Sequence, residues 1–263
     1  MARLFPRPDR YVSPCGHLYA SITNQKICHA LPFLRGLRTV FISDIHVTER
    51  TLDTDIDTLT ASVQALSPHL LLLGGDYSDS MEGSVRFFNS LKRLKPPLGC
   101  YGVLGNNDAE AWKNRYHQLR SLLAKAGCRL LVNESESLTF NGGHIIVAGT
   151  DECKYGHPDY TNLYPSSASS DTYRILVSHY PILPKVQPDL LLSGHTHGGQ
   201  FNILGLTPYS VGFERILKPR AAAIAVSGLH EINGMTVLVS KGIGASRIQW
   251  RVGVQPEINS LLF

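Results

Sequence analysis

The chain has 263 residues and a formal net charge of +4, a length that one hydrophobic core can still serve as a single domain. Hydrophobic residues make up 43% and charged residues 17%, which excludes a disordered chain, a coiled coil and a collagen-like repeat. The charge is too small to indicate a nucleic-acid partner. We expect one domain over residues 1–263, with residues 1–37 as an N-terminal hairpin extension and 152–170 as a variable loop.

The cysteines and the apolar runs indicate the cellular location of the protein. Five cysteines occur without a CxxC pair: Cys15, Cys28, Cys100, Cys128 and Cys153. This pattern favours neither a disulfide framework nor a thiolate zinc site, and it fits a reducing cytoplasm. No apolar run approaches the roughly 18 to 20 residues of a membrane span. We expect a cytoplasmic protein, and Arg3, Arg7 and Arg10 leave open whether the N-terminus is solvated or contacts the inner membrane peripherally.

Short apolar runs ending in polar residues define the predicted core. The runs are residues 39–43, 69–73, 100–104, 173–178 and 189–193. Their length and composition are typical of strands buried on both faces. Helical spacing is found over residues 52–66, 81–94 and 109–126, the last closed by Gly127. The alternation predicts an α/β core, in which the carboxyl ends of the strands carry the ligand site.

The two flanking regions predict hairpins and further strands. Residues 11–35 have the alternating character of a hairpin that turns at Asn24-Gln25, and residues 130–150 predict a second hairpin that turns at 141–143. Residues 221–255 predict additional strands.

The polar residues that follow the five runs include a set of possible metal ligands. Those with a lone pair for a divalent cation are Asp44, His46, Asp76, Asn106, His179, His195 and His197. Each alone has an ordinary explanation as a helix cap, a turn residue or a polar surface residue. Because all five strand ends carry such residues and none carries a thiolate, the sequence favours a metal site.

Taken in order, these residues form a recognisable series. The blocks D44-I-H46, G-G-D76, G-N106-N107-D108, S-H179-Y-P and G-H195-T-H197-G-G-Q resemble the calcineurin-like metallophosphoesterase superfamily over about residues 37–245. The resemblance implies an α/β fold, a four-layer αββα sandwich, with two divalent metal ions. One ion would be bound by Asp44, His46, Asp76 and His197, and the other by Asp76, Asn106, His179 and His195. Manganese is the expected metal, with iron or zinc as alternatives.

The resemblance also implies a reaction. The ion pair would outweigh the negative charge of Asp44, Asp76 and a bridging hydroxide, so the site would attract a phosphoryl group. That metal-bridged hydroxide would attack phosphorus in line, while the ions stabilise the charge on its oxygens. The expected catalytic residues are Asp76, His195 and Asn107.

Asn107 departs from the family pattern. It stands where the family has a histidine that protonates the leaving oxygen. An amide can donate a hydrogen bond to a developing charge but cannot be a general acid. We therefore expect a phosphoric anhydride or activated ester as substrate, unless His17, His29 or His157 supplies the proton.

Two neighbouring carboxylates carry further expectations. Asp108 is expected to cap the helix that follows it. Asp79 stands where the tyrosine-liganded purple phosphatases have their tyrosine, so the sequence disfavours that branch.

The C-terminal third suggests a substrate. The block G-H195-T-H197-G-G-Q is followed by residues 201–206, by S-G-L-H-E-I-N-G-M-T-V-L-V-S-K-G-I-G-A-S at 227–246 and by Pro256-Glu257-Ile258. This series resembles the bacterial subgroup of cell-envelope phosphoesterases and UDP-2,3-diacylglucosamine pyrophosphatases, which implies a nucleotide-linked lipid pyrophosphate cleaved to UMP and lipid X. Residues 201–206, with Val211 and Phe213, are either an apolar rim for acyl chains or packed strand and loop. Arg215 and Lys218 are expected to bind a substrate phosphate, with a solvated loop as the alternative.

Other functions stay open beside this one. A broad phosphodiesterase or phosphomonoesterase would act on small or lipid phosphate esters with the same metal site. A non-catalytic metal-binding scaffold is disfavoured because all seven ligand positions are present. A nuclease is disfavoured because the sequence has no basic stripe, so we expect no nucleic-acid partner.

Overall fold

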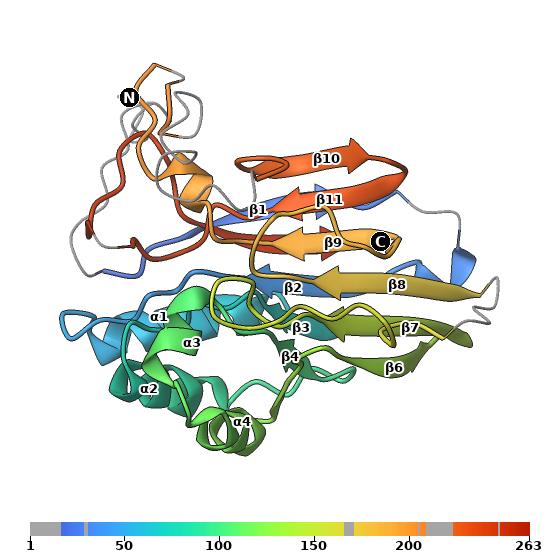
Figure 1. Cartoon of the computed structure of the whole chain (residues 1–263), viewed down its shortest axis with the longest axis horizontal. Helices are drawn as coiled ribbons and strands as arrows, with labels where there is room; N and C mark the ends of the chain where they lie inside the picture. The colour runs from blue at the N-terminus through green and yellow to red at the C-terminus, as the bar shows by residue number, and fades with distance from the viewer. Residues whose placement is uncertain (1–16, 29–30, 166–170, 205, 209–222, 247) are drawn as a thin grey trace.

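Two mixed β-sheets form the centre of the protein (Figure 1). The computed structural model describes residues 17–28, 31–165, 171–204, 206–208, 223–246 and 248–263. The first sheet consists, in spatial order, of β1 (Ser21–Lys26), β12 (Glu257–Leu262), β2 (Arg38–Ile42), β3 (Leu70–Leu73), β4 (Cys100–Gly102) and β5 (Cys128–Leu130). The second consists of β10 (Gly228–Ile232), β11 (Met235–Val239), β9 (Leu190–Ser193), β8 (Thr172–Val177), β7 (Gly143–Gly149) and β6 (Glu134–Phe140). The five apolar runs of the sequence are confirmed as β2, β3, β4, β8 and β9.

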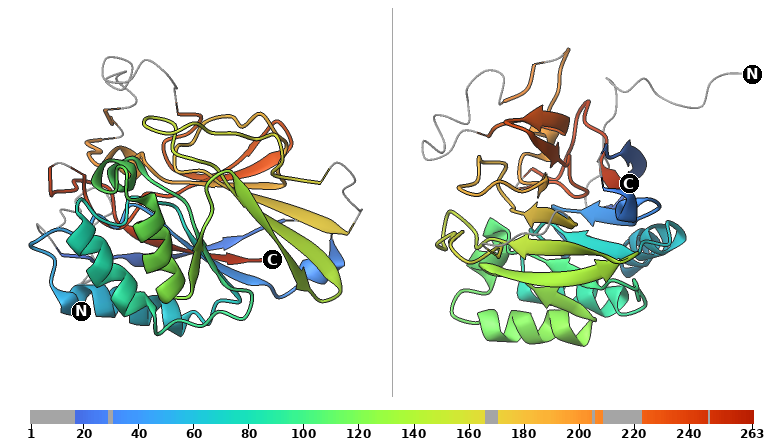
Figure 2. Two further views of the ribbon diagram at one scale, coloured as in Figure 1. Left: turned by 60° about the horizontal axis from the view of Figure 1, so that its bottom comes forward. Right: turned by 90° about the vertical axis from the view of Figure 1, so that its right-hand side faces the viewer.

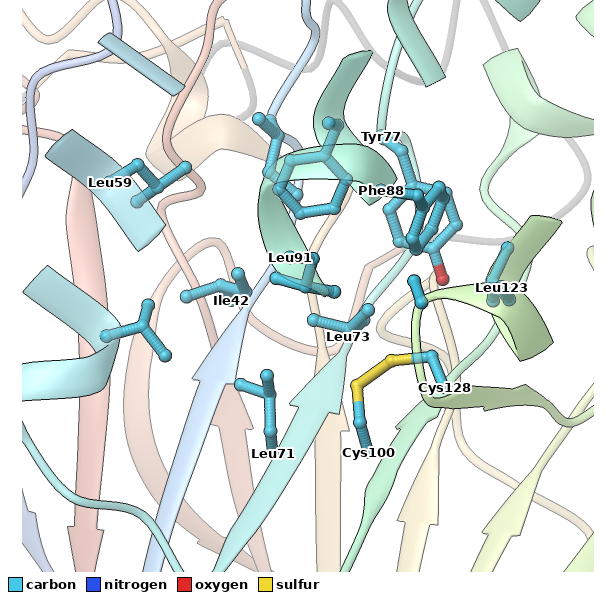
Figure 3. Packing of buried hydrophobic residues seen from close by; sticks show 14 of the residues in the cluster. Ile42, Leu59, Leu71, Leu73, Tyr77, Phe88, Leu91, Cys100, Leu123 and Cys128 are labelled. Carbon is cyan, nitrogen blue, oxygen red and sulfur yellow. A yellow bond between two sulfur atoms is a disulfide. The ribbon is translucent and has the colours of Figure 1, made fainter. Parts of the chain in front are cut away.

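Helices cover the outer face of the first sheet. They are α1 (Asp53–Ala65), α2 (Met81–Leu91), α3 (Asn106–Ala111) and α4 (Tyr116–Lys125), and they gather on one side of the molecule (Figure 2). Leu71 and Leu73 of β3 pack there against Phe88 and Leu91 of α2 (Figure 3). Among the described residues, no helix is both long enough and apolar enough to span a membrane.

A second core lies between the two sheets. Phe41 and Leu72 of the first sheet and Ile175 and Leu192 of the second belong to one buried cluster. β2, β3, β8 and β9 are buried at nearly every position, because their two faces contact different layers. The α/β architecture with two packed sheets is thereby confirmed.

The outer face of the second sheet is covered by loops. Leu176 and Val237 on that face pack with Leu163, Tyr160 and Val186 from irregular segments. Within the ranges given above, this face carries no α-helix. The second helical layer expected for the sandwich is therefore replaced there by loops, among them residues 152–165, where we expected a variable loop.

Two predicted elements are wrong. Residues 109–126 form α3 and α4 instead of one helix, because Asn114 has a left-handed backbone (φ 64°) that interrupts the helical turn. The hairpin at Asn24-Gln25 is also absent, since both residues lie inside β1, which pairs in parallel with β12. The alternating burial of β1 reflects an edge strand with one buried face. The second hairpin is confirmed as β6 and β7.

The cysteine pattern disfavoured a disulfide framework, but one disulfide is present. Cys100 and Cys128 form a disulfide, seen in Figure 3 as the yellow bond between β4 and β5. They are 28 positions apart in sequence but are direct partners in the register of the two parallel strands, with Cα atoms 4.5 Å apart. Neither Cys28 nor Cys153 takes part in a disulfide. Because Cys100 and Cys128 form a disulfide, the cysteines of the sequence no longer indicate a reducing compartment.

Candidate metal centre

The predicted ligands converge on one edge of the two sheets. β2 leads to Asp44 and His46, β3 to Asp76, β8 to His179, and β9 to His195 and His197, while Asn106 opens α3 after β4. Figure 1 shows β8 and β9 ending on the same side of the molecule, as their parallel pairing requires. Six of the seven residues are buried, and His195 is partly exposed.

The backbone at these residues is unusual. Five of them have positive φ angles: Asp44 (54°), His46 (46°), Asp76 (52°), His195 (68°) and His197 (53°). Such left-handed conformations cost non-glycine residues free energy and persist where the surroundings enforce them, often at functional sites. Gly194 fits between the two sheets because a Cβ there would collide with Ser43 and Asp44. The turns therefore direct the side chains toward one another.

One group of donor atoms comes from Asp44, His46 and His197, whose ligand atoms all lie within 4.8 Å of one another. Nε2 of His46 lies 3.2 Å from Nε2 of His197, which in turn lies 3.5 Å from Oδ1 of Asp44. Asp44 is held by Ser43, whose hydroxyl donates to Oδ2 at 2.6 Å, and by the amide of His195 at 3.0 Å.

A second group consists of Asp44, Asp76 and His179. Nε2 of His179 lies 3.5 Å from Oδ2 of Asp76 and 3.3 Å from Nδ1 of His195. The same oxygen of Asp76 is also 3.5 Å from Nε2 of His46. Asp44 is the member common to the two groups, and Asp76 contacts one histidine of each. Nδ1 of His179 donates to the carbonyl of Gly74 at 2.7 Å, which turns Nε2 toward the carboxylates.

The two aspartates dominate the electrostatics. Burial raises the pKa of Asp44, and the nearby Asp76 raises it further, against a partial offset from His179. Burial also opposes the charge of Asp76, but His179 and His46 outweigh it and lower the pKa of that carboxyl. For His179, burial disfavours the charge, yet Asp76 and Asp44 prevail and raise its pKa to about 10. Without a metal ion, a protonated imidazole balances the buried carboxylates.

The donor set fits divalent metal ions. Carboxylate oxygens, imidazole nitrogens and an amide oxygen, with no thiolate among them, suit manganese, iron or zinc. A cation would take over the charge balance that protonated His179 supplies in the metal-free site. The residues present therefore fit a pair of ions.

Three residues around the site lay outside the sequence prediction. The carboxylate of Asp79 contacts Nδ1 of His46 at 2.7 Å. The ring of Tyr180 lies on that of His195, with centroids 3.8 Å apart. Arg251, fully buried, donates to the carbonyls of Lys241 (2.6 Å) and Gly244 (2.7 Å) and to Nδ1 of His197 (3.0 Å).

The sequence carried different amounts of information on the role of these three residues. Asp79 was considered in the sequence only as the residue at the tyrosine position, although its spacing of three residues from Asp76 could have indicated a place in the site. Tyr180 directly follows a predicted ligand but carried no signal of its own, and Arg251 lies 54 positions from its histidine partner.

Asn107 and Asp108 lie beside the metal centre. The backbone amide of Asn107 donates to Oδ1 of Asp76 at 2.8 Å, and its side chain contacts Asp79. Asp108 accepts from the amides of Gly105 (2.9 Å) and Asp76 (2.7 Å), so it caps α3 and also joins that helix to the β3 turn. Burial and the charge of Asp76 raise the pKa of Asp108 to about 8.

The proposed substrate contacts are only partly within the described residues. Arg215, Lys218, Val211, Phe213 and His29 lie outside them. His17 pairs with Asp55, and the backbone of His157 bonds to Asp151 and Asn133, and none of these partners is a proposed metal ligand.

The predicted apolar rim at residues 201–206 has three exposed apolar side chains. Ile203, Leu204 and Leu206 are 62%, 90% and 64% exposed, so they form a surface and are not packed core. Exposed Ile248 and Trp250 lie on the adjacent loop, whose carbonyls accept from the side chain of Gln200.

The site agrees with what comparison with known proteins finds. The family model for calcineurin-like phosphoesterases matches residues 37–199. The chain is 33% identical over 227 residues to the uncharacterized protein YpbG of Bacillus subtilis, covering 84% of this chain and 78% of that protein. It is 27% identical to the uncharacterized metallophosphoesterase YkoQ of the same organism, covering 87% and 84%.

The chain is also similar to an animal protein and to solved structures. The chain is 30% identical to a bovine transmembrane protein with a metallophosphoesterase domain, covering 88% of this chain and 54% of that protein. A crystal structure of TT1561 of Thermus thermophilus aligns with 12% identity and a TM-score of 0.46, covering 79% of this chain and 90% of that one. By its family match and its relatives, the chain belongs to the calcineurin-like phosphoesterase family of metal-dependent phosphoester hydrolases.

Proposed function

We propose that the protein is a dinuclear phosphohydrolase that cleaves a nucleotide-linked lipid pyrophosphate, with UDP-2,3-diacylglucosamine as the lead substrate. Manganese is the proposed metal. One ion would be held by Asp44, His46, Asp76 and His197, and the other by Asp76, Asn106, His179 and His195. Bound there, the ions would supply Lewis acidity that activates water and stabilises charge on phosphoryl oxygens. The observation that carries the proposal is the position of Asp76, whose Oδ2 is 3.5 Å from both His46 and His179.

The protein's own residues would bind and orient the substrate. His195 is the most accessible of the proposed ligands, and its ring is supported from one side by Tyr180. Asn107 is partly buried beside His46 and Asp79, and an N–H of its amide would donate to an oxygen of the leaving group. Such a contact stabilises a developing anion without transferring a proton.

The lack of a general acid at Asn107 supports an anhydride. An alkoxide leaving group needs a proton, and losing the acid costs about 10² to 10⁴ in rate. A phosphate leaving group is already a stable anion and needs none. We propose that cleavage of a pyrophosphate is favoured for this reason, and that Arg215 and Lys218 bind the second phosphate.

The exposed rim supports an acylated substrate. Ile203, Leu204 and Leu206 follow the metal-binding turn at His197 by less than ten residues, and Trp250 lies on the neighbouring loop. Exposed apolar side chains grouped in this way favour contact with acyl chains or a lipid surface. We propose that the protein works at the surface of the inner membrane, where a diacylated substrate resides.

A substrate panel tests the proposal. Purified protein loaded with manganese would be incubated with UDP-2,3-diacylglucosamine, a cyclic nucleotide and an aryl phosphate, and products would be separated by chromatography. We expect UMP from the first substrate at the highest rate. Hydrolysis confined to the aryl or cyclic ester would refute the lipid pyrophosphate and establish the broad esterase. No hydrolysis by protein that retains two ions would indicate a metal-binding scaffold.

A further inference from the structure

Asp79 contacts a proposed metal ligand, His46, without being one of the seven proposed ligands. It follows Asp76 by three residues, and its side chain is 37% exposed. Its Oδ1 lies 2.7 Å from Nδ1 of His46 and accepts a hydrogen bond from Nδ2 of Asn107, also at 2.7 Å. One carboxylate oxygen thus contacts two residues from different segments of the chain.

The contact with His46 fixes an imidazole ring. Because a carboxylate only accepts, Nδ1 of His46 is the donor, and the lone pair is left on Nε2. That nitrogen faces the site, 3.5 Å from Asp76 and 3.2 Å from His197. A carboxylate behind a metal-binding histidine holds the ring in place and makes it a stronger ligand.

The contact with Asn107 fixes an amide. With Nδ2 of Asn107 turned to Asp79, its Oδ1 points the other way and accepts from Nδ2 of Asn106 at 2.6 Å. An amide binds a metal ion through its oxygen. Because Nδ2 of Asn106 faces Asn107, Oδ1 of Asn106 lies on the other side of that amide group. There Tyr180 donates to it at 3.3 Å.

We propose that Asp79 is a positioning residue for both metal ions, acting on His46 directly and on Asn106 through Asn107. This inference rests on the proposed function, because it requires that both ions bind. Asn107, at the family's general-acid position, thereby orients a metal ligand. The chain His46–Asp79–Asn107–Asn106 links one proposed ligand of each ion through three hydrogen bonds.

Binding of Co²⁺ tests this proposal without measuring activity. The metal-free full-length protein would be titrated with Co²⁺ and followed by its visible absorption, which reports the ligands of each ion. His197→Ala and Asn106→Ala would assign the two binding transitions. The test variants are Asp79→Ala, Asp79→Asn and Asn107→Leu. Asp57→Ala is the matched control, because Asp57 is 44% exposed and accepts similar hydrogen bonds from Ser90 and Arg93.

We expect Asp79→Ala to weaken both transitions by about 10- to 100-fold, the usual effect of removing a residue that supports metal ligands. Asn107→Leu should weaken only the transition assigned to Asn106. Asp57→Ala should change neither. If Asp79→Ala does not fold, Asp79→Asn, which keeps the shape and loses the charge, should still weaken the His46 transition about tenfold.

Three results would overturn the inference. They are unchanged binding in the Asp79 variants, an Asp79→Ala effect confined to one transition, and equal weakening of both transitions by Asn107→Leu. A wild-type protein that binds fewer than two ions would overturn the proposed function as well. Two ions bound by the wild type, with unchanged Asp79 variants, would overturn this inference alone.

Discussion

Individual residues at the metal centre are held in conformations that they would not adopt freely. A left-handed backbone costs a non-glycine residue roughly 1–2 kcal/mol, and Asp44, Asp76 and His197 all have one. Two buried carboxylates add electrostatic repulsion, which protonated His179 relieves in the metal-free protein. The side chains are therefore arranged before any ion binds, and the stability of the rest of the fold offsets the cost.

Asn107→His tests whether the missing general acid determines the substrate. An imidazole at this position could protonate an alkoxide, so hydrolysis of an alkyl phosphodiester should rise by about tenfold or more relative to hydrolysis of a pyrophosphate. Initial rates on the two substrates, measured at saturating metal, give this ratio. Asn107→Gln, which has no titratable proton, is the control. An unchanged ratio in the histidine variant would contradict the role assigned to position 107.

At the level of elements, the sequence predicted what depends on local pattern. Apolar runs such as 69–73 became buried strands, and the ligands that follow them meet because parallel strands end at one edge. The break at Asn114 and the pairing of β1 with β12 depend on one backbone angle and on a partner more than 200 residues away. The contacts of Asp79 and Arg251 with the metal centre are likewise tertiary, so no spacing rule could have shown them.

The Cys100–Cys128 disulfide should stabilise the first sheet measurably. It closes a loop of 28 residues between β4 and β5, for which chain entropy predicts about 3.6 kcal/mol. Guanidinium unfolding with and without dithiothreitol should show a loss of that size, together with two additional reactive thiols. The double variant Cys100→Ala/Cys128→Ala should unfold alike under both conditions. Equal stability of the wild type with and without reductant would contradict a contribution from the bridge.

For the whole molecule, the candidate metal centre takes its donor residues from both sheets. Asp44 and Asp76 come from the first sheet, and His179 and His197 from the second. Ions bound between them would tie the two sheets together. Metal binding should therefore raise the stability of the entire fold, since a ligand that binds only the native state stabilises it by mass action.

Metal binding should also release protons. The pKa of His179 is raised to about 10 in the metal-free protein, so the imidazole is protonated at pH 7 and must lose its proton to bind an ion. Affinity should accordingly rise with pH up to about 10. Calorimetry with Mn²⁺ at pH 7, in two buffers of different ionisation enthalpy, measures the released protons. His179→Gln should release fewer. Equal heats in both buffers would contradict the charge balance described above.

The place of β12 in the first sheet sets an order for folding. It lies between β1 and β2 and forms the link between them. During synthesis, residues 38–199 emerge with every proposed metal ligand, yet β2 still lacks the neighbour that shields one of its edges. A ribosome-bound chain that stops before residue 257 should thus be open to proteolysis near β2. Because β2 leads to Asp44 and His46, stable metal binding would then require that β12 has joined the sheet.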